Sequence, residues 1–177
     1  KSLAEKLGWE YFSGGDFMRA YAIERGLFDK NKTTHHDAMV YSDDFDREVD
    51  YGMREKMQNQ QGRVYDSWLS GFLAQGISGV LKVLAYCSDD AVRVDRIVNR
   101  DKVTVLEAKQ HIFEREQKNT LKWQRMYAGE WQEWVGSGPI DFWDPKLYDV
   151  VIDTFSHDRE ETLRLTLEAL GYVETRK

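Results

Sequence analysis

Four short apolar runs alternate along this chain with stretches of helical periodicity. The runs span residues 9–12, 63–68, 81–87 and 149–154. The helices are expected at 16–26, 44–58, 69–74, 89–100, 104–127 and 158–170. Because strands that alternate with helices form parallel sheets with crossover connections, the pattern predicts an α/β fold. The Trp- and Gly-rich segment from 131 to 143 is expected to be an irregular connection.

Polar turns follow the apolar runs, at 13–16, 66–68, 88–90 and 154–156. Ligands of open parallel sheets bind at the carboxyl ends of the strands. These four segments are therefore expected to converge on one edge of the sheet and to line a binding crevice there.

The first of these turns, Ser13-Gly14-Gly15, joins an N-cap residue to two glycines, and Arg19 follows one turn into the expected helix. Glycines let the backbone approach a ligand, and the N–H groups at a helix start favour an anion. The planar guanidinium of Arg19 can bind a phosphate through two hydrogen bonds. An ordinary capped turn with a solvated arginine has the same pattern, so both interpretations stay open.

A carboxylate and two arginines are further candidates for phosphate chemistry. Asp66 ends an apolar run, where it can hold Mg²⁺ through water, contact an acceptor, or cap the helix expected from Leu69. Arg96 and Arg100 lie four residues apart, so both project from one helix face and can stabilise a phosphoryl group during transfer. A solvated basic helix face would have the same spacing.

Arg115 and Lys122 lie about two turns apart on the long helix expected from Thr104, so they can reach one bound phosphate. No zinc spacing joins the histidines, which are expected at the surface: His35, His36, His111 and His157. Core packing is favoured over a base-stacking platform for the aromatic residues at 123, 127, 131, 134 and 143.

Charge and composition limit the partners. The net charge of −6 argues against polymeric nucleic acid, but nine bases against five acids between residues 93 and 125 suit a small polyanion such as a nucleotide. A single cysteine excludes an internal disulfide and fits a reducing cytoplasm. No apolar stretch approaches the roughly 20 residues that span a bilayer. The expectation is a cytoplasmic monomer that has no membrane partner.

In the order of these segments, the chain resembles the nucleoside monophosphate kinases of the P-loop class, above all their cytidylate kinase-like branch. The resemblance covers essentially the whole chain. The segments that carry it are the end of a helix at 1–8, the turn and helix at 13–26, the acidic helix at 46–55, the paired arginines within 92–100, and the dipeptide at 115–116 with the strand at 148–154. The resemblance implies a three-layer P-loop NTPase-like fold with helices on both faces of a parallel sheet. It implies one kinase-like domain over residues 1–177, with an acceptor-binding helical insertion at about 27–62 and a helical lid at about 100–128.

The resemblance also implies roles for individual residues, with ATP and Mg²⁺ as cofactors. The expected contacts with the nucleotide acceptor come from Ser13, Gly14, Gly15, Arg19, Trp68, Arg115 and Lys122. Arg96 and Arg100 are expected to contact ATP and, with Asp66, to form the catalytic group. Asp66 would meet the metal only through water.

Two departures from the family pattern limit what the resemblance implies. The phosphate-binding loop, with glycines followed by Lys and Ser or Thr, is absent and is expected just before Lys1, together with the central strand of the sheet. Without them this stretch is expected to lack kinase activity and to leave two inner strand edges unpaired. In addition, Trp68 stands where the family has arginine, and Lys122 where arginine is more frequent, which leaves the acceptor open.

Three functions therefore compete. The first is ATP-dependent phosphorylation of a nucleoside monophosphate, with CMP or dCMP favoured, to the diphosphate. The second is a P-loop kinase of another small acceptor, which Trp68 and the Trp-rich segment favour. The third is a degenerate kinase fold that binds nucleotides or a protein partner without catalysis.

Overall fold

The computed structural model describes residues 1–27 and 38–172, which divide into two compact units. Unit 1 comprises Lys1–Ser13, Asp50–Ser88 and Asp141–Lys177, and unit 2 comprises Gly14–Val49 and Asp89–Ile140. His35 and His36 lie outside the described residues, as does part of the expected acceptor-binding insertion.

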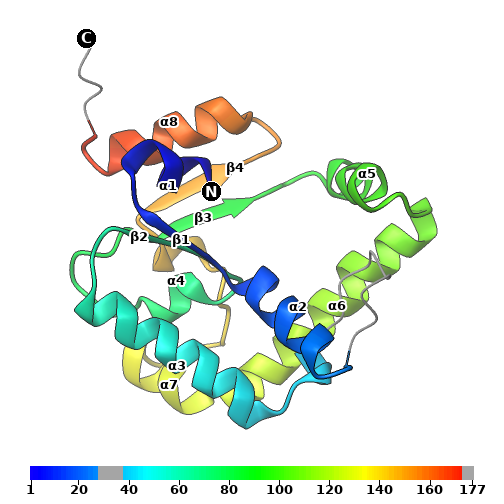
Figure 1. Cartoon of the computed structure of the whole chain (residues 1–177), viewed down its shortest axis with the longest axis horizontal. Helices are drawn as coiled ribbons and strands as arrows, with labels where there is room; N and C mark the ends of the chain where they lie inside the picture. Colours follow the sequence, from blue (N-terminus) through cyan, green and yellow to red (C-terminus); the bar gives the residue numbers. More distant parts are fainter. Residues whose placement is uncertain (28–37, 173–177) are drawn as a thin grey trace. The chain divides into compact units, whose positions relative to one another are not determined.

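Unit 1 contains the four described strands. Its elements are α1 (Ser2–Leu7), β1 (Glu10–Ser13), β2 (Arg63–Asp66), α4 (Ser70–Leu73), β3 (Val83–Tyr86), η2 (Pro145–Leu147), β4 (Val150–Asp153) and α8 (Arg159–Ala169), with the second part of α3 (Asp43–Asn59). The expected parallel pairing is confirmed, because β1 pairs with β2 and β3 pairs with β4, both in parallel (Figure 1). The described strands form two sheets of two strands each rather than one continuous sheet.

The helices of unit 1 bury apolar surface against the strands and against each other. α1 packs against α8 and β2, while α8 also packs against β4. The first helix ends at Leu7, because Gly8 follows with a left-handed φ of 67°. At the other end of the chain, Asp158 and Glu161 form a capping box that begins α8.

The segment before β4 is anchored on the short helix α4. The rings of Phe72 and Phe142, both fully buried, meet edge to face at 4.9 Å. The side-chain amide of Gln75 donates to the Leu147 carbonyl at 2.8 Å. The hydroxyl of Tyr148 donates to the Phe142 carbonyl at 2.7 Å, and burial raises the pKa of this phenol to about 12. These contacts fix the loop at residues 141–148 against α4.

Unit 2 is helical. Its elements are α2 (Gly14–Glu24), η1 (Ala38–Val40), the first part of α3, α5 (Asp90–Asp101), α6 (Val105–Met126) and α7 (Ala128–Trp134). The predicted cap of the long helix is confirmed, because Thr104 and Glu107 form a capping box. α6 packs against α5, η1 and α7. None of the helices in the two described ranges is long and apolar enough to cross a membrane.

Helix α7 corrects the expectation of an irregular connection from residue 131 onward. Trp123, Tyr127 and Trp131 recur every four residues, and all three side chains are buried. This spacing places the rings on one stripe of a helix, so burial favours helical backbone as far as Trp134 despite Gly129. The expected core role of these three rings is confirmed. The other predicted helices and strands match the observed ones to within two residues at each end.

Substituting Gly71 is expected to destabilise the fold. A Cβ at Gly71 would lie 2.2 Å from Cε1 of Tyr148, whose ring is held by its hydrogen bond to Phe142. Gly71→Ala should therefore lower the free energy of unfolding by about 1–3 kcal/mol in urea titrations.

Gly52→Ala is the matched control, because a Cβ at this position in α3 meets no atom within 4 Å. It should raise the free energy of unfolding by about 0.5–1 kcal/mol, since alanine is the better helix former. Shifts of the same sign in the two variants would contradict this account of the contact between α4 and Tyr148.

Candidate functional site

The carboxyl ends of β1 and β2 bring two of the predicted site residues together. Ser13 and Asp66 are partners in the parallel register, and the Tyr11 hydroxyl donates to Oδ2 of Asp66 at 2.8 Å. Helix α4 begins after Leu69 and has no side-chain cap, so the alternative that Asp66 caps this helix is wrong. Asp66 is an exposed carboxylate, oriented by a phenol, at the end of a strand.

Trp68 lies in the turn between β2 and α4, two residues beyond Asp66. Its side chain is 39% exposed, and its ring meets that of Trp143 edge to face at 5.9 Å. The indole N–H of Trp143 donates to the Trp68 carbonyl at 3.3 Å. The anchored loop at 141–148 therefore holds a second indole beside Trp68, a partner that sequence reasoning did not identify.

The carboxyl ends of β3 and β4 are joined in the same way. The backbone N–H and the hydroxyl of Ser88 both donate to the Asp153 carboxylate, and these bonds hold the pKa of Asp153 below its usual value. Both the N–H and the hydroxyl of Thr154 donate to the Tyr86 carbonyl. The polar turns thus meet in pairs as expected, and their convergence on one common edge stays a prediction.

In unit 2, Gly14 and Gly15 open α2 directly after β1. Neither glycine has a positive φ, and a Cβ on Gly15 would meet no atom within 4 Å. The fold itself therefore does not require glycine at position 15, and the helix start has open space beside its backbone. Arg19 lies in the second turn of α2 and is half-buried.

Arg96 and Arg100 are both exposed on α5. The Arg100 guanidinium donates from Nε to Oδ1 of Asp101 at 2.7 Å and from Nη2 to Oδ2 at 2.8 Å. This hydrogen bonding to a largely buried carboxylate raises the pKa of Arg100. Arg93 joins α5 to α6 through Glu116 at 2.6 Å. Arg96 and Arg100 thus belong to a helix that is joined to α6.

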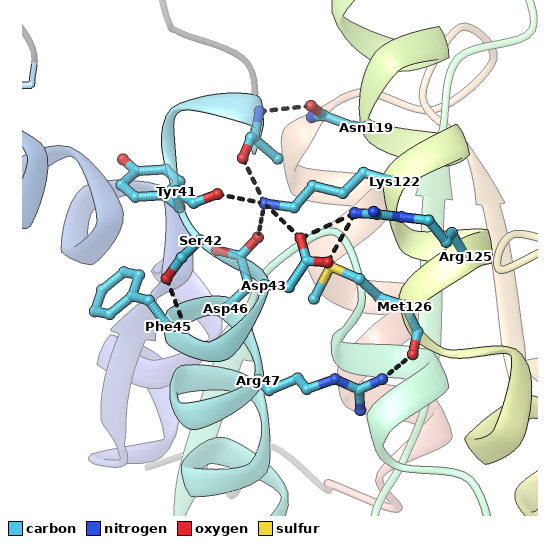
Figure 2. Close-up of polar contacts among 11 residues, drawn as sticks. Tyr41, Ser42, Asp43, Phe45, Asp46, Arg47, Asn119, Lys122, Arg125 and Met126 are labelled. Carbon is cyan, nitrogen blue, oxygen red and sulfur yellow. Dashed lines mark hydrogen bonds and ion pairs between the residues drawn. The ribbon is translucent and has the colours of Figure 1, made fainter.

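Lys122 is at the centre of the most extensive polar network (Figure 2). Its side chain is 1% exposed, and its ammonium donates to the carbonyls of Ala38 and Tyr41 at 2.7 and 2.8 Å and to Oδ2 of Asp46 at 2.7 Å. These three bonds use the three N–H groups of the ammonium. Lys122 therefore joins α6 to η1 and α3, and a direct contact with phosphate stays a prediction.

Neighbouring residues of α6 extend this network toward the start of α3. The amide oxygen of Asn119 accepts the Ala38 N–H at 2.7 Å, and Arg125 donates to both oxygens of Asp43. Burial raises the pKa of Asp46, although its bond to Lys122 acts in the opposite direction. Sequence reasoning missed Asp46 as the partner of Lys122 and Asn119 as the acceptor of the Ala38 N–H. A polar stripe at three-residue intervals on α6, at 119, 122 and 125, was the available signal.

Tyr41 connects this network to α2. Its carbonyl accepts from Lys122, and its hydroxyl donates to the Met18 carbonyl at 2.7 Å, one residue before Arg19. Burial raises the pKa of Tyr41, while the charge of Arg115 acts to lower it. The structure thus joins Lys122 and the helix of Arg19 through one tyrosine.

The two described histidines, His111 and His157, are half-buried, and burial lowers the pKa of His111. Within residues 1–27 and 38–172, no group of three or more His, Cys, Asp and Glu side chains has the arrangement of a metal site.

Lys122→Met is expected to lower the free energy of unfolding by about 3–5 kcal/mol, because it leaves the Asp46 carboxylate buried without its counter-charge. Lys118→Met, at an exposed position on the same helix, should change it by less than about 0.5 kcal/mol. The double variant Lys122→Met/Asp46→Leu should recover most of the loss. Equal unfolding midpoints for the two single variants would contradict the structural role of this pair.

The chain is similar to known proteins over most of its length. The model of the cytidylate kinase-like family matches residues 1–156. A cytidylate kinase of Haloarcula marismortui is 31% identical over 172 residues, which cover 96% of this chain and 80% of the relative. Cytidylate kinases of Methanosarcina mazei and Aeropyrum pernix are 29% and 31% identical over 96% and 95% of this chain, and in each case 88% of the relative is covered. The chain belongs to the cytidylate kinase-like family.

Proposed function

We propose that this protein phosphorylates a nucleoside monophosphate to the diphosphate with ATP, and that CMP or dCMP is the favoured acceptor. The main support is the family match over residues 1–156. Further support comes from unit 2, where Tyr41 accepts a hydrogen bond from Lys122 of α6 and donates one to the carbonyl of Met18 in α2, the residue before Arg19. Cations placed in this way suit an acceptor that carries a phosphate.

On the acceptor side, the guanidinium of Arg19 would hold the phosphate through two hydrogen bonds. Arg115 would assist, and Lys122 would assist indirectly by holding the turn at 38–41. Helix α2 begins directly after Ser13, at Gly14 and Gly15. The N–H groups of these two glycines would face the same anion. The open space beside Gly15 would allow this approach. Trp68 would contact the remainder of the acceptor.

On the donor side, Arg96 and Arg100 would stabilise the charge that spreads over the phosphoryl oxygens during transfer. Arg100 is held by Asp101 in the observed structure, so it would exchange this carboxylate for phosphate. We assign the lid to residues of about 100–128 and the acceptor-binding insertion to about 27–62, within one kinase-like domain. Closure of the lid would exclude water, which otherwise hydrolyses ATP.

The residues at the carboxyl end of β2 fit a magnesium ion held through water. Asp66 is a single exposed carboxylate oriented by Tyr11, and Mg²⁺ in phosphoryl-transfer sites binds through one or two carboxylates together with substrate phosphates. When bound, the ion would neutralise charge on the ATP phosphates.

The finer architecture follows from the two separate strand pairs. Among the described strands, β2 pairs only with β1 and β3 only with β4. Open strand edges are unstable, so we infer that a further strand of the protein pairs between β2 and β3 and completes a three-layer P-loop NTPase-like fold. A glycine-rich loop that ends in Lys-Ser or Lys-Thr, encoded within about 15 residues before Lys1, would support catalysis rather than binding alone.

The proposal is tested by release of ADP from the full-length protein with CMP, dCMP, UMP, AMP and several non-nucleotide alcohols as acceptors. Turnover with CMP or dCMP supports it. Turnover with a sugar or an acid but with no nucleotide would overturn it and favour a P-loop kinase of another small acceptor. Nucleotide binding without any turnover would favour a non-catalytic member of the family.

The specific observation in favour of another acceptor is the pair of Trp68 and Trp143. Two indoles held edge to face present apolar surface at the carboxyl end of β2, where the family pattern has a cationic side chain. Indole surface suits a ring rather than a phosphate.

Arg19→Ala in the full-length protein is expected to raise the KM for CMP about 10- to 100-fold and to lower kcat, because a charge-assisted pair of hydrogen bonds is lost. Arg164→Ala is the matched control, since Arg164 is exposed on α8 and pairs with Glu168. It should leave both constants unchanged. Equal kinetics for the two variants would remove Arg19 from the acceptor site.

Trp68→Arg is expected to shift acceptor preference toward cytidine nucleotides, because the new guanidinium can contact the acceptor phosphate. The measurement is kcat/KM for CMP relative to the other acceptors. Trp9→Arg is the matched control, because it introduces the same charge at a residue of nearly equal exposure, 38%. Trp9 precedes β1, whereas Trp68 follows a strand. A shift of equal size in both variants would show an effect of net charge alone.

A further inference from the structure

We propose that Tyr41 positions Arg19 for acceptor binding and that the buried Lys122–Asp46 pair holds Tyr41 in place. The inference rests on the proposed function and deepens it. Tyr41 acts as a positioning residue, and it and Lys122 influence the acceptor through α2 rather than by touching it.

The Lys122 ammonium uses all of its hydrogen-bond donors within the protein. Its three N–H groups are donated to Ala38, Tyr41 and Asp46, and its positive charge is balanced by a carboxylate that is 4% exposed. A buried cation that is already paired and fully hydrogen-bonded gains little from a further anion and loses its partners if it moves. The geometry therefore assigns Lys122 to holding the turn at 38–41 against α6.

Tyr41 is the residue of this turn that reaches α2. Tyr41 receives the Lys122 bond at its carbonyl and donates its own hydroxyl to the carbonyl of Met18. One residue therefore joins the fixed turn to the backbone of α2. Its side chain is 7% exposed, so the phenol is held by packing as well as by the hydrogen bond.

The Tyr41 hydroxyl meets α2 directly before Arg19. Met18 lies within α2 (Gly14–Glu24), and the next residue is Arg19. A shift of this backbone moves the Arg19 guanidinium directly, and misplacement of a binding group by about 1 Å is enough to weaken catalysis strongly. The bond from Tyr41 thus acts at the point of α2 where a small displacement matters most.

Ring packing supplies a second attachment of α2 that does not depend on the hydroxyl. Tyr21 of α2 stacks on Phe45 of α3 with ring centroids 3.9 Å apart, and Tyr41 contacts both rings. Removing only the Tyr41 hydroxyl therefore leaves the aromatic cluster in place. Tyr41→Phe should fold normally and should separate positioning from packing.

The test compares Tyr41→Phe with wild type in the full-length protein. The Kd for CMP, measured by calorimetry, and the KM for CMP should rise about three- to tenfold, the change expected from one lost hydrogen bond. The KM for ATP should stay unchanged. In hydrogen exchange, amides at 18–24 should lose protection relative to amides of α6.

Thr166→Val is the matched control. The Thr166 hydroxyl is also buried and donates to a backbone carbonyl, that of Thr162, at 2.8 Å in α8. This variant should lower the melting temperature slightly and leave both KM values and the exchange of α2 unchanged.

The outcomes separate this inference from the proposed function. If Tyr41→Phe lowers the melting temperature but leaves the Kd for CMP and the exchange of α2 unchanged, the positioning role is overturned. An equal rise in the KM for CMP and for ATP would also overturn it, because the effect would then be global. If wild type neither binds nor phosphorylates CMP, the proposed function fails. In that case hydrogen exchange still tests the link from Tyr41 to α2. Faster exchange of the α2 amides in Tyr41→Phe would support this link, and unchanged exchange would overturn it.

Discussion

The buried ion pair between Lys122 and Asp46 is the interaction on which the described helical unit depends most. Charges are costly to bury singly, so the pair is stable only where both partners are held and further hydrogen bonds satisfy the ammonium. Those bonds come from the turn at 38–41, whose own regular structure is the three-residue 3-10 helix η1. The pair therefore gives a fixed position to a turn that backbone hydrogen bonding alone would leave weakly defined.

A different constraint organises the unit that contains the strands. Each strand has four residues and one hydrogen-bonded neighbour among those described, so side-chain contacts have to support the pairs. The bonds from Tyr11 to Asp66 and from Ser88 to Asp153 lie at the carboxyl ends of the strands. Of these groups, Asp66 is also the carboxylate to which we assign the magnesium ion, so a contact at a strand end and the proposed function share this one position.

Much of the local structure could be predicted from the sequence, because short-range physics determines it. Thr104 with Glu107 set the start of the long helix, and the apolar runs set the strands. The role of Lys122 could not be predicted in the same way. Its spacing from Arg115 on the helix is compatible with a phosphate contact, but its partner Asp46 lies 76 residues earlier in the chain. Helix α7 was missed for a simpler reason, since Gly136, Gly138 and Pro139 just beyond it outweighed the four-residue period of its buried rings.

The sequence by itself determined the order of helices and strands, their parallel pairing and the resemblance to the cytidylate kinase-like family, since periodicity, capping and motif order are properties of neighbouring residues. Only the tertiary structure decided which polar side chains pair with one another. In this structure Lys122 is buried with Asp46, and Arg100 is hydrogen-bonded to Asp101. Asp66 does not cap α4, and a second indole lies beside Trp68. The physical reason is that the environment of a charge is set by what packs around it, and those groups come from distant parts of the chain.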